Sequence, residues 1–214
     1  MCEGVAPRGE VPLRSGPYER WGKRPLELAV VLALLLPGLP LLLLIAGMVV
    51  LRLGRPVLFR QVRAGRGGQP FTVWKLRSMC APRFEGEEDA ARLTPFGRRL
   101  RATGLDELPQ LLNVLRGEMS LIGPRPLPPD YTGHFTARQR LRLRVRPGLL
   151  GLSVARGRNA LPWEERLEWD ARYAEQVSLR GDVAAALGSL GVLLRGRGAS
   201  APGHATSPRL GNRN

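Results

Sequence analysis

Cysteine and histidine are scarce in this 214-residue chain, which contains Cys2, Cys80, His134 and His204 and no others. Two cysteines cannot build a disulfide framework, and together with two isolated histidines they form no zinc-ligand cluster. Neither histidine has a convincing nucleophile and acid partner, so a serine–histidine–aspartate arrangement is not indicated. This usage fits a protein that faces a reducing compartment.

Acidic residues are also few, with 18 Asp and Glu against 33 Lys and Arg, for a net charge of +15. Such an excess predicts an anionic partner, which is nucleic acid, an acidic membrane surface or a phosphorylated substrate. No reading helix, zinc finger or aromatic strand motif supports the nucleic-acid alternative. The charge alone therefore does not identify the partner.

Charge is absent from one long stretch, Leu28 to Leu51, which has 24 residues. As a straight helix it is about 36 Å long, enough to cross the hydrocarbon core of a bilayer. The stretch begins too late for a signal peptide and lacks a small-residue cleavage site. Pro37 and Pro40 lie in its middle and predict a kink or break, because proline lacks the backbone donor and clashes with the preceding turn.

Basic residues flank this stretch on both sides. Arg20, Lys23 and Arg24 precede it, and no acid occurs between its end and Glu85. The basic residues that follow it are Arg52, Arg55, Arg60, Arg63 and Arg66. The positive-inside tendency favours a cytoplasmic position for both flanks, which suits a helix that enters, bends and returns. A single kinked transmembrane anchor stays open on these grounds.

Short strands and helices are predicted after the membrane stretch. Residues 57–62 and 71–76 read as a hairpin around a glycine-rich turn, and 118–123 as a further strand. Thr94 and Pro95 predict the start of a short helix, and residues 138–146 fit either a half-buried strand or a basic helix. Amphipathic helices are expected at 162–179 and 182–194, the second of them docked in the membrane interface.

Two adjacent acids, Asp106 and Glu107, precede Pro109 and an apolar helical run. Leu108, Leu111, Leu112 and Leu115 have helical spacing and are predicted to face the core. The acids then lie at a helix N-terminus, where the dipole favours ionised carboxylates. On these features alone, a cap and a dipole partner explain the pair as well as chemistry does.

Arg125 lies between Pro124 and Pro126 in a stiff loop, the second basic feature near these acids. A guanidinium held in this way suits bidentate binding of phosphate. A surface salt bridge is the alternative.

The ordered motifs resemble the bacterial sugar transferase family, the monotopic phosphoglycosyl transferases, in its small form. The resemblance covers Lys23 to Leu194. It rests on the proline-broken apolar stretch, "FTVWKLRSM", "TPFGRRLRATGLDELPQLLNVLRGEMSLIGPRPL", "RLRVRPGLLGL" and "GRNALPWEERLEWDARYAEQVSLRGD". It departs from the family pattern at Leu36, where a serine usually precedes the proline, and at Gly104, where a serine is commoner.

The resemblance implies transfer of a phospho-sugar from a UDP-sugar to polyprenol phosphate, with release of UMP, at the start of glycan assembly. It implies that Asp106 is the nucleophile, that Asp106 and Glu107 hold Mg²⁺, and that Arg125 binds phosphate. Lys75, Arg77 and Arg146 match basic positions of the family and are candidates for substrate binding. The small form is associated with N-acetylated sugars.

The implied fold is α/β (α+β) and mostly helical, with a re-entrant membrane helix, a small cytosolic domain of short strands and interfacial helices. The expected divisions are an N-terminal segment at 1–22, the re-entrant helix at 23–53, the catalytic domain at 54–194 and a flexible basic tail at 195–214. The implied location is the cytoplasmic face of a bacterial inner membrane. Anionic lipid is then the expected partner and nucleic acid is not, while dimerisation through the C-terminal helices and a catalytically silent scaffold stay open.

Overall fold

The computed structural model describes residues 15–85, 87–196, 198–199, 201 and 210 of the chain. Within these residues the protein is mostly helical, with short strands and no closed sheet, as predicted. The 1–22 segment and the 195–214 tail expected from the sequence lie largely outside the described residues. A hydrogen bond from the Asn159 side chain to the Ala199 carbonyl, 2.8 Å long, fixes one described part of the tail against the body.

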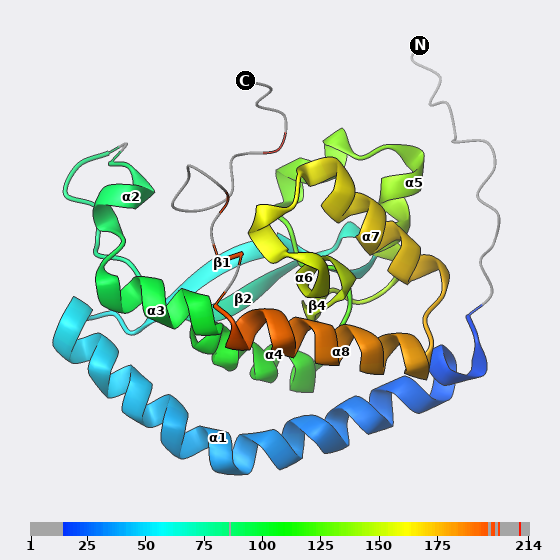
Figure 1. Cartoon of the computed structure of the whole chain (residues 1–214), viewed down its shortest axis with the longest axis horizontal. Helices are drawn as coiled ribbons and strands as arrows, with labels where there is room; N and C mark the ends of the chain where they lie inside the picture. The colour runs from blue at the N-terminus through cyan, green and yellow to red at the C-terminus, as the bar shows by residue number, and fades with distance from the viewer. Residues whose placement is uncertain (1–14, 86, 197, 200, 202–209, 211–214) are drawn as a thin grey trace.

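The longest element is α1 (Lys23–Leu53), which follows a short π-helix, η1 (Tyr18–Gly22). The helical span Tyr18–Leu53 reaches a mean hydropathy of 2.8 and is the one described helix that is long and apolar enough to cross a membrane. α1 stays helical through Pro37 and Pro40 and does not break there. Figure 1 shows it bending in its middle, with both arms directed toward the rest of the chain.

A β-hairpin follows α1, as the sequence predicts. β1 (Leu58–Ala64) pairs antiparallel with β2 (Pro70–Leu76) around η2 (Arg66–Gly68). Gly67 and Gly68 have φ values of 66° and 76° at its tip, a backbone conformation that residues with a Cβ rarely adopt. The hairpin carries Lys75 toward the acidic pair described below.

The helices after the hairpin begin at recognisable signals. α2 (Asp89–Arg92) is a single turn, and α3 (Pro95–Thr103) begins after Thr94, whose hydroxyl accepts a 3.1 Å hydrogen bond from the Gly97 amide. The predicted cap is therefore confirmed. Gly104, with φ 72°, ends α3 and leads into the 3₁₀ helix η3 (Leu105–Gln110) and then α4 (Leu111–Arg116).

Two short strands form the second sheet. β3 (Ser120–Ile122) pairs parallel with β4 (Gly148–Leu150), and a Cβ on Gly148 would lie 2.0 Å from the Gly123 nitrogen, so only glycine fits there. Of the residues 138–146, for which a strand and a helix were left open, 138–144 are helical and Val145 and Arg146 are not. The remaining elements are η4 (Pro129–His134), α5 (Ala137–Arg140), η5 (Leu141–Arg144), α6 (Leu152–Arg156), η6 (Arg158–Ala160), α7 (Trp163–Glu175) and α8 (Leu179–Leu194).

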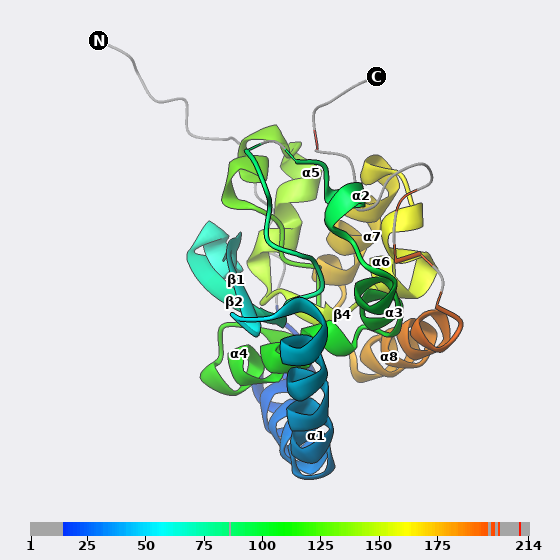
Figure 2. The ribbon, with the colours of Figure 1, turned by 90° about the vertical axis from the view of Figure 1, so that its left-hand side faces the viewer.

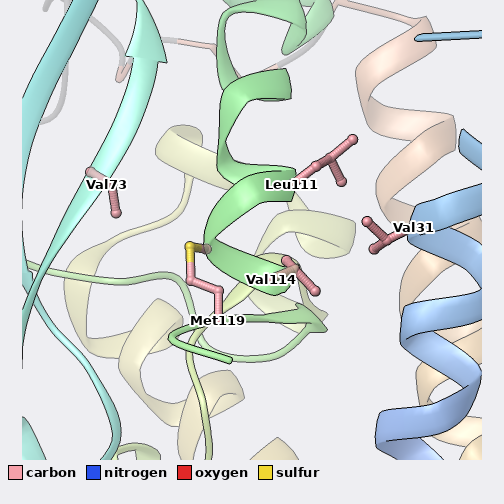
Figure 3. Close-up of a cluster of buried hydrophobic side chains, with 5 residues drawn as sticks. All are labelled: Val31, Val73, Leu111, Val114 and Met119. Atoms are coloured by element: carbon pink, nitrogen blue, oxygen red, sulfur yellow. The ribbon is translucent and has the colours of Figure 1, made fainter. Parts of the chain in front are cut away.

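Both arms of α1 pack against the same body. Val31 of the first arm joins a buried cluster drawn in Figure 3, whose other members are Val73, Leu111, Val114 and Met119 from β2, α4 and the turn after α4. Ile45 and Val49 of the second arm join a cluster with Leu76 and Leu100. The bend between the two arms contributes no buried residue.

Polar contacts hold both ends of α1 as well. At the first end, the buried Glu27 carboxylate accepts hydrogen bonds from the Leu121 and Ile122 amides at 3.0 and 3.4 Å, and Lys23 pairs with Asp182 of α8. At the other end, Arg77 donates to the carbonyls that end α1 and follow it, those of Leu53, Gly54 and Arg55. The two ends of α1 are thus attached to one folded unit.

Apolar side chains are exposed on the elements closest to α1. In Figures 1 and 2, α4 and α8 lie on the side of the body that faces α1. Leu112 of α4 was expected in the core, but it is 44% exposed, so that prediction is wrong. The exposed large apolar residues of α8 are Leu179, Val183, Leu187, Leu190 and Leu194. Helical spacing identifies an apolar face without saying whether protein or lipid covers it.

Candidate active site

A cavity of about 910 Å³ lies between the hairpin, η3, the proline-rich loop after β3 and the segment from η6 to α7. Asp106 and Glu107 line it together with Lys75, Arg77 and Arg125, so five of the predicted site residues line one cavity. This size suits a ligand larger than a single phosphate.

The 3₁₀ helix η3 presents the two acids to this cavity. Gly104 reverses the chain after α3, and Asp106 and Glu107 follow within the first turn of η3, where they are only 6% and 7% exposed. Neither acid caps a helix, because the residue before η3 is Gly104 and the residue before α4 is Gln110. The alternative interpretation of Asp106 as a helix cap is therefore wrong.

Glu107 is fully engaged by two cations. Its Oε1 lies 2.8 Å from Lys75 Nζ and 2.5 Å from Arg125 Nη2, while Arg125 Nη1 donates to Oε2 at 3.2 Å. Burial raises the pKa of Glu107, but Arg125 and Lys75 outweigh it and hold that pKa well below its usual range. Glu107 is thus a permanent anion that neutralises buried positive charge.

Asp106 is in the opposite situation. Among the described residues, its side chain makes no hydrogen bond and no ion pair. Burial, followed by repulsion from Glu107, raises the pKa of Asp106 to about 6, against the attraction of Lys75, Arg101 and Arg125. The carboxylate is mostly ionised at neutral pH, lacks a fixed partner and faces the cavity, which suits a nucleophile or metal ligand.

A buried network of hydrogen bonds and an ion pair fixes the main chain at Arg125. The Arg142 guanidinium donates to the Arg125 carbonyl and pairs with the Asp170 carboxylate at 2.8 Å. Ser153 donates to the other oxygen of Asp170, also at 2.8 Å. Arg142, Asp170 and Ser153 come from η5, α7 and α6, so three separate elements position the loop that carries Arg125.

Five more arginines line the cavity, and none of them is among the site residues predicted from the sequence. They are Arg63, Arg92, Arg101, Arg158 and Arg166. Burial lowers the pKa of Arg63 and of Arg166 to about 10, so both have lost much of their hydration. Most of them are far apart in the chain. The sequence signal for a role in the site was that Arg158 and Arg166 both lie in the block "GRNALPWEERLEWDARYAEQVSLRGD", which resembles the family. Together with Lys75 and Arg125 they make this cavity suitable for a polyanion such as a diphosphate.

The other two predicted basic residues do not join the acids in this way. Arg77 lines the cavity, but its guanidinium is committed to the carbonyls at the end of α1. Arg146 lines a different cavity of about 780 Å³, and its Nε donates to the Gly117 carbonyl at 2.8 Å.

The residues present fit Mg²⁺ shared with a phosphorylated substrate. No cluster of three or more His, Cys, Asp or Glu suitable for a metal occurs in the part of the chain that the structure describes. Mg²⁺ does not require one, since it commonly takes one or two carboxylates and completes its shell with water and substrate phosphates. Asp106 has free oxygens for this, whereas both oxygens of Glu107 are already paired. Asp106 is therefore the better ligand of the two.

Asp106→Asn should stabilise the metal-free protein. Because the pKa is raised from 3.8 to about 6, the ionised carboxylate destabilises the fold increasingly between these values and in full above about pH 6. Its removal is therefore expected to raise the free energy of unfolding at pH 7, by on the order of 2 kcal/mol. This advantage should shrink below pH 6 and vanish near pH 4, where both forms carry a neutral side chain. Chemical unfolding in EDTA across this range measures it, and a destabilised variant at pH 7 would contradict the assigned environment.

The sequence of the whole chain was compared with known protein families and proteins. A family model described as bacterial sugar transferase matches residues 18–196. The chain is 39% identical over 191 residues to the uncharacterized sugar transferase EpsL of Bacillus subtilis, covering 88% of this chain and 95% of the relative. It is 42% identical over 207 residues to a UDP-glucose:undecaprenyl-phosphate glucose-1-phosphate transferase of Caulobacter vibrioides, covering 89% and 73%. It is 34% identical over 200 residues to an undecaprenyl-phosphate galactose phosphotransferase of Salmonella typhimurium, covering 84% and 42%.

Proposed function

The chain belongs to the bacterial sugar transferase family and is a phosphoglycosyl transferase, and we propose that it uses Asp106 to transfer a phospho-sugar from a UDP-sugar to polyprenol phosphate. The observation that carries this mechanism is the contrast between two adjacent buried acids. Glu107 is paired with Lys75 and Arg125, while Asp106 has no fixed partner and faces an arginine-lined cavity. The products are polyprenol-diphosphate-sugar and UMP.

In the first step, a carboxylate oxygen of Asp106 attacks the phosphorus that bears the sugar. The bond from this phosphorus to the bridging oxygen breaks, and UMP leaves with that oxygen. Asp106 then carries the phospho-sugar as an acyl phosphate. Arg125, held in place by Glu107 and by Arg142, donates to the phosphoryl oxygens as their charge shifts.

In the second step, a phosphate oxygen of polyprenol phosphate attacks the same phosphorus. The bond between Asp106 and phosphorus breaks, which restores the carboxylate and releases the lipid diphosphate sugar. Two steps let the two anionic substrates occupy one cationic site in turn, so the UDP-sugar and the polyprenol phosphate do not repel each other there. The buried arginines, Arg63, Arg158 and Arg166, bind whichever phosphate is present.

Asp106, together with phosphate oxygens of the donor, would hold Mg²⁺. When bound, the ion supplies charge neutralisation for the diphosphate and for the departing UMP. Glu107 acts indirectly in this arrangement, because it keeps Lys75 and Arg125 ionised and oriented toward the cavity.

The membrane arrangement that we propose is re-entrant, on the cytoplasmic face of a bacterial inner membrane. α1 bends near its prolines, and both of its arms pack against the same catalytic body (Figure 1). A folded body that holds both ends of the helix supports placing them on one side of the bilayer. The exposed apolar residues of α8 then lie at the interface on that side.

Cysteine labelling tests this topology. In a Cys2→Ser, Cys80→Ser background, we introduce Ser15→Cys before the helix or Arg55→Cys after it, both at exposed positions. A membrane-impermeant maleimide should label both variants in inside-out membrane vesicles and neither in spheroplasts. Labelling of the two variants from opposite sides would establish a transmembrane span and contradict the re-entrant helix.

The donor is tested by release of UMP in nanodiscs that contain polyprenol phosphate and Mg²⁺. The small form of the family favours an N-acetylated sugar, whereas two of the three relatives above are named for glucose or galactose. The panel therefore includes UDP-N-acetylhexosamines, UDP-glucose and UDP-galactose. Release from one donor, dependent on Mg²⁺, is expected. If no donor releases UMP, even after the panel is extended to modified N-acetylated sugars, the proposed transfer is contradicted.

A further inference from the structure

A second cavity, of about 780 Å³, lies beside the first arm of α1 and shares no lining residue with the cavity around Asp106. The start of α1, the hairpin tip, β3 and the segment before β4 enclose it. Its basic residues are Arg20, Lys23, Arg24, Arg66 and Arg146, and its acidic residues are Glu19 and Glu27.

Both acids of this cavity are already engaged. Glu27 accepts hydrogen bonds from the Leu121 and Ile122 amides and pairs with Lys23 at 3.1 Å. Glu19 pairs with Arg144 at 3.2 Å. Both carboxylates therefore already have hydrogen-bond or ion-pair partners other than Arg24, Arg66 and Arg146.

Three of those arginines, Arg24, Arg66 and Arg146, make no ion pair within the described ranges. Each donates to a main-chain carbonyl: Arg24 Nη2 to Leu115 at 3.2 Å, Arg66 Nε to Arg144 at 3.0 Å and Arg146 Nε to Gly117 at 2.8 Å. A guanidinium has five N–H donors, so most donors of the three remain for a ligand.

Two further observations favour an anionic ligand. Arg24 Nη1 is buried and has no hydrogen-bond partner among the described residues. A buried donor without a partner is rare and costly, so the Arg24 guanidinium has hydrogen-bonding capacity that this part of the chain does not use. In addition, burial together with the nearby charges of Arg24 and Arg66 lowers the pKa of Arg146, which an anion between them would reverse.

We propose that this cavity is a second phosphate site, separate from the reaction centre, which binds the headgroup phosphate of an anionic membrane lipid. Arg24 lies directly before the apolar stretch of α1, whose exposed apolar residues begin at Leu26. This places the cavity at the depth of the lipid phosphates if α1 lies in the membrane. Ile122 and Val145 add apolar lining beside the arginines, which suits a lipid better than a free anion. The inference rests on the membrane position of α1 and not on the catalytic step.

Lipid retention tests the site without donor sugar or turnover, so its outcome is independent of the proposed transfer. The protein is purified in nanodiscs of phosphatidylcholine with a minor fraction of phosphatidylglycerol, and retained lipids are counted by native mass spectrometry. Wild type should retain phosphatidylglycerol selectively. Arg24→Gln and Arg146→Gln should each bind it about tenfold more weakly, as expected for a lost charge-assisted contact.

Arg52→Gln is the matched control, because it removes the same charge from the exposed end of the other arm of α1. It should leave retention within about twofold of wild type. Arg66→Gln, at the exposed hairpin tip, provides a variant that is expected to fold normally, and thermal unfolding monitors all four. An equal loss of phosphatidylglycerol retention in Arg52→Gln would overturn the site. It would show that the lipid is attracted by the general positive charge of the protein and not bound in this cavity. Displacement of the lipid by millimolar inorganic phosphate would overturn the lipid as its ligand.

Discussion

UMP release is expected to fall by at least about 10³-fold in Asp106→Asn, the largest effect on activity that the structure predicts. An amide of nearly the same shape keeps the packing of η3 but cannot form the acyl phosphate. Binding of the donor should persist, because Glu107, Arg125 and the remaining cavity arginines are untouched. The loss therefore belongs to kcat, and burst experiments with the preferred donor measure it.

Asp130→Asn is the control for this substitution. Asp130 lines the same cavity but is exposed, and the proposed chemistry assigns it no role. Activity should stay within a few-fold of wild type. Intact-protein mass spectrometry without acceptor should find one phospho-sugar on wild type and on Asp130→Asn, and none on Asp106→Asn. Continued release of UMP by Asp106→Asn would eliminate Asp106 as the nucleophile.

Glu107→Gln should produce the largest loss of stability. Its carboxylate neutralises Lys75 and Arg125, and removing one partner of a buried ion pair leaves uncompensated charge, at a cost of about 3–5 kcal/mol. Because the pKa of Glu107 is lowered, its stabilising contribution is complete above its unfolded value near 4.5. The contribution is lost only as the pH falls through the folded-state pKa. The difference between wild type and Glu107→Gln should thus be constant from pH 8 to about pH 5.

Chemical unfolding of Glu107→Gln and of a surface control measures this difference. Glu168 also pairs with arginines, Arg138 and Arg172, but on an exposed helix face, so Glu168→Gln should cost less than about 1 kcal/mol. Lys75→Met in the Glu107→Gln background should restore part of the lost stability, because it removes one of the two unpaired cations. A Glu107→Gln protein no less stable than Glu168→Gln would contradict the assigned role.

The two adjacent acids therefore have opposite effects on the fold. Asp106→Asn is expected to stabilise the protein while it abolishes the reaction, whereas Glu107→Gln is expected to destabilise it and also to impair activity. A nucleophile must keep a carboxylate without a permanent partner, and burial makes that costly to the folded state. Its neighbour, tied to Arg125 and Lys75, preserves the electrostatic environment in which that carboxylate works.

Features with local causes were predictable from the sequence alone. The uncharged stretch defined α1, the glycines between two apolar runs defined the hairpin, and Thr94 followed by Pro95 marked the start of α3. Each depends on residues within a few positions of one another, through backbone sterics, hydrogen-bonding capacity and hydrophobic length. The order of the motifs also identified the family and with it the acidic pair.

Only the tertiary structure distinguished the two acids. Asp106 and Glu107 share a helical turn and a burial level, and their difference arises from Lys75 of β2 and Arg125 of a distant loop. Likewise, Arg101 and Arg158 line the cavity around Asp106 while Arg146 lines another. Charge and helical period are local properties, but the free energy of a charged group depends on which remote groups the fold brings within a few ångströms of it. Chain folding in three dimensions is therefore what turned one of two equivalent carboxylates into the candidate nucleophile.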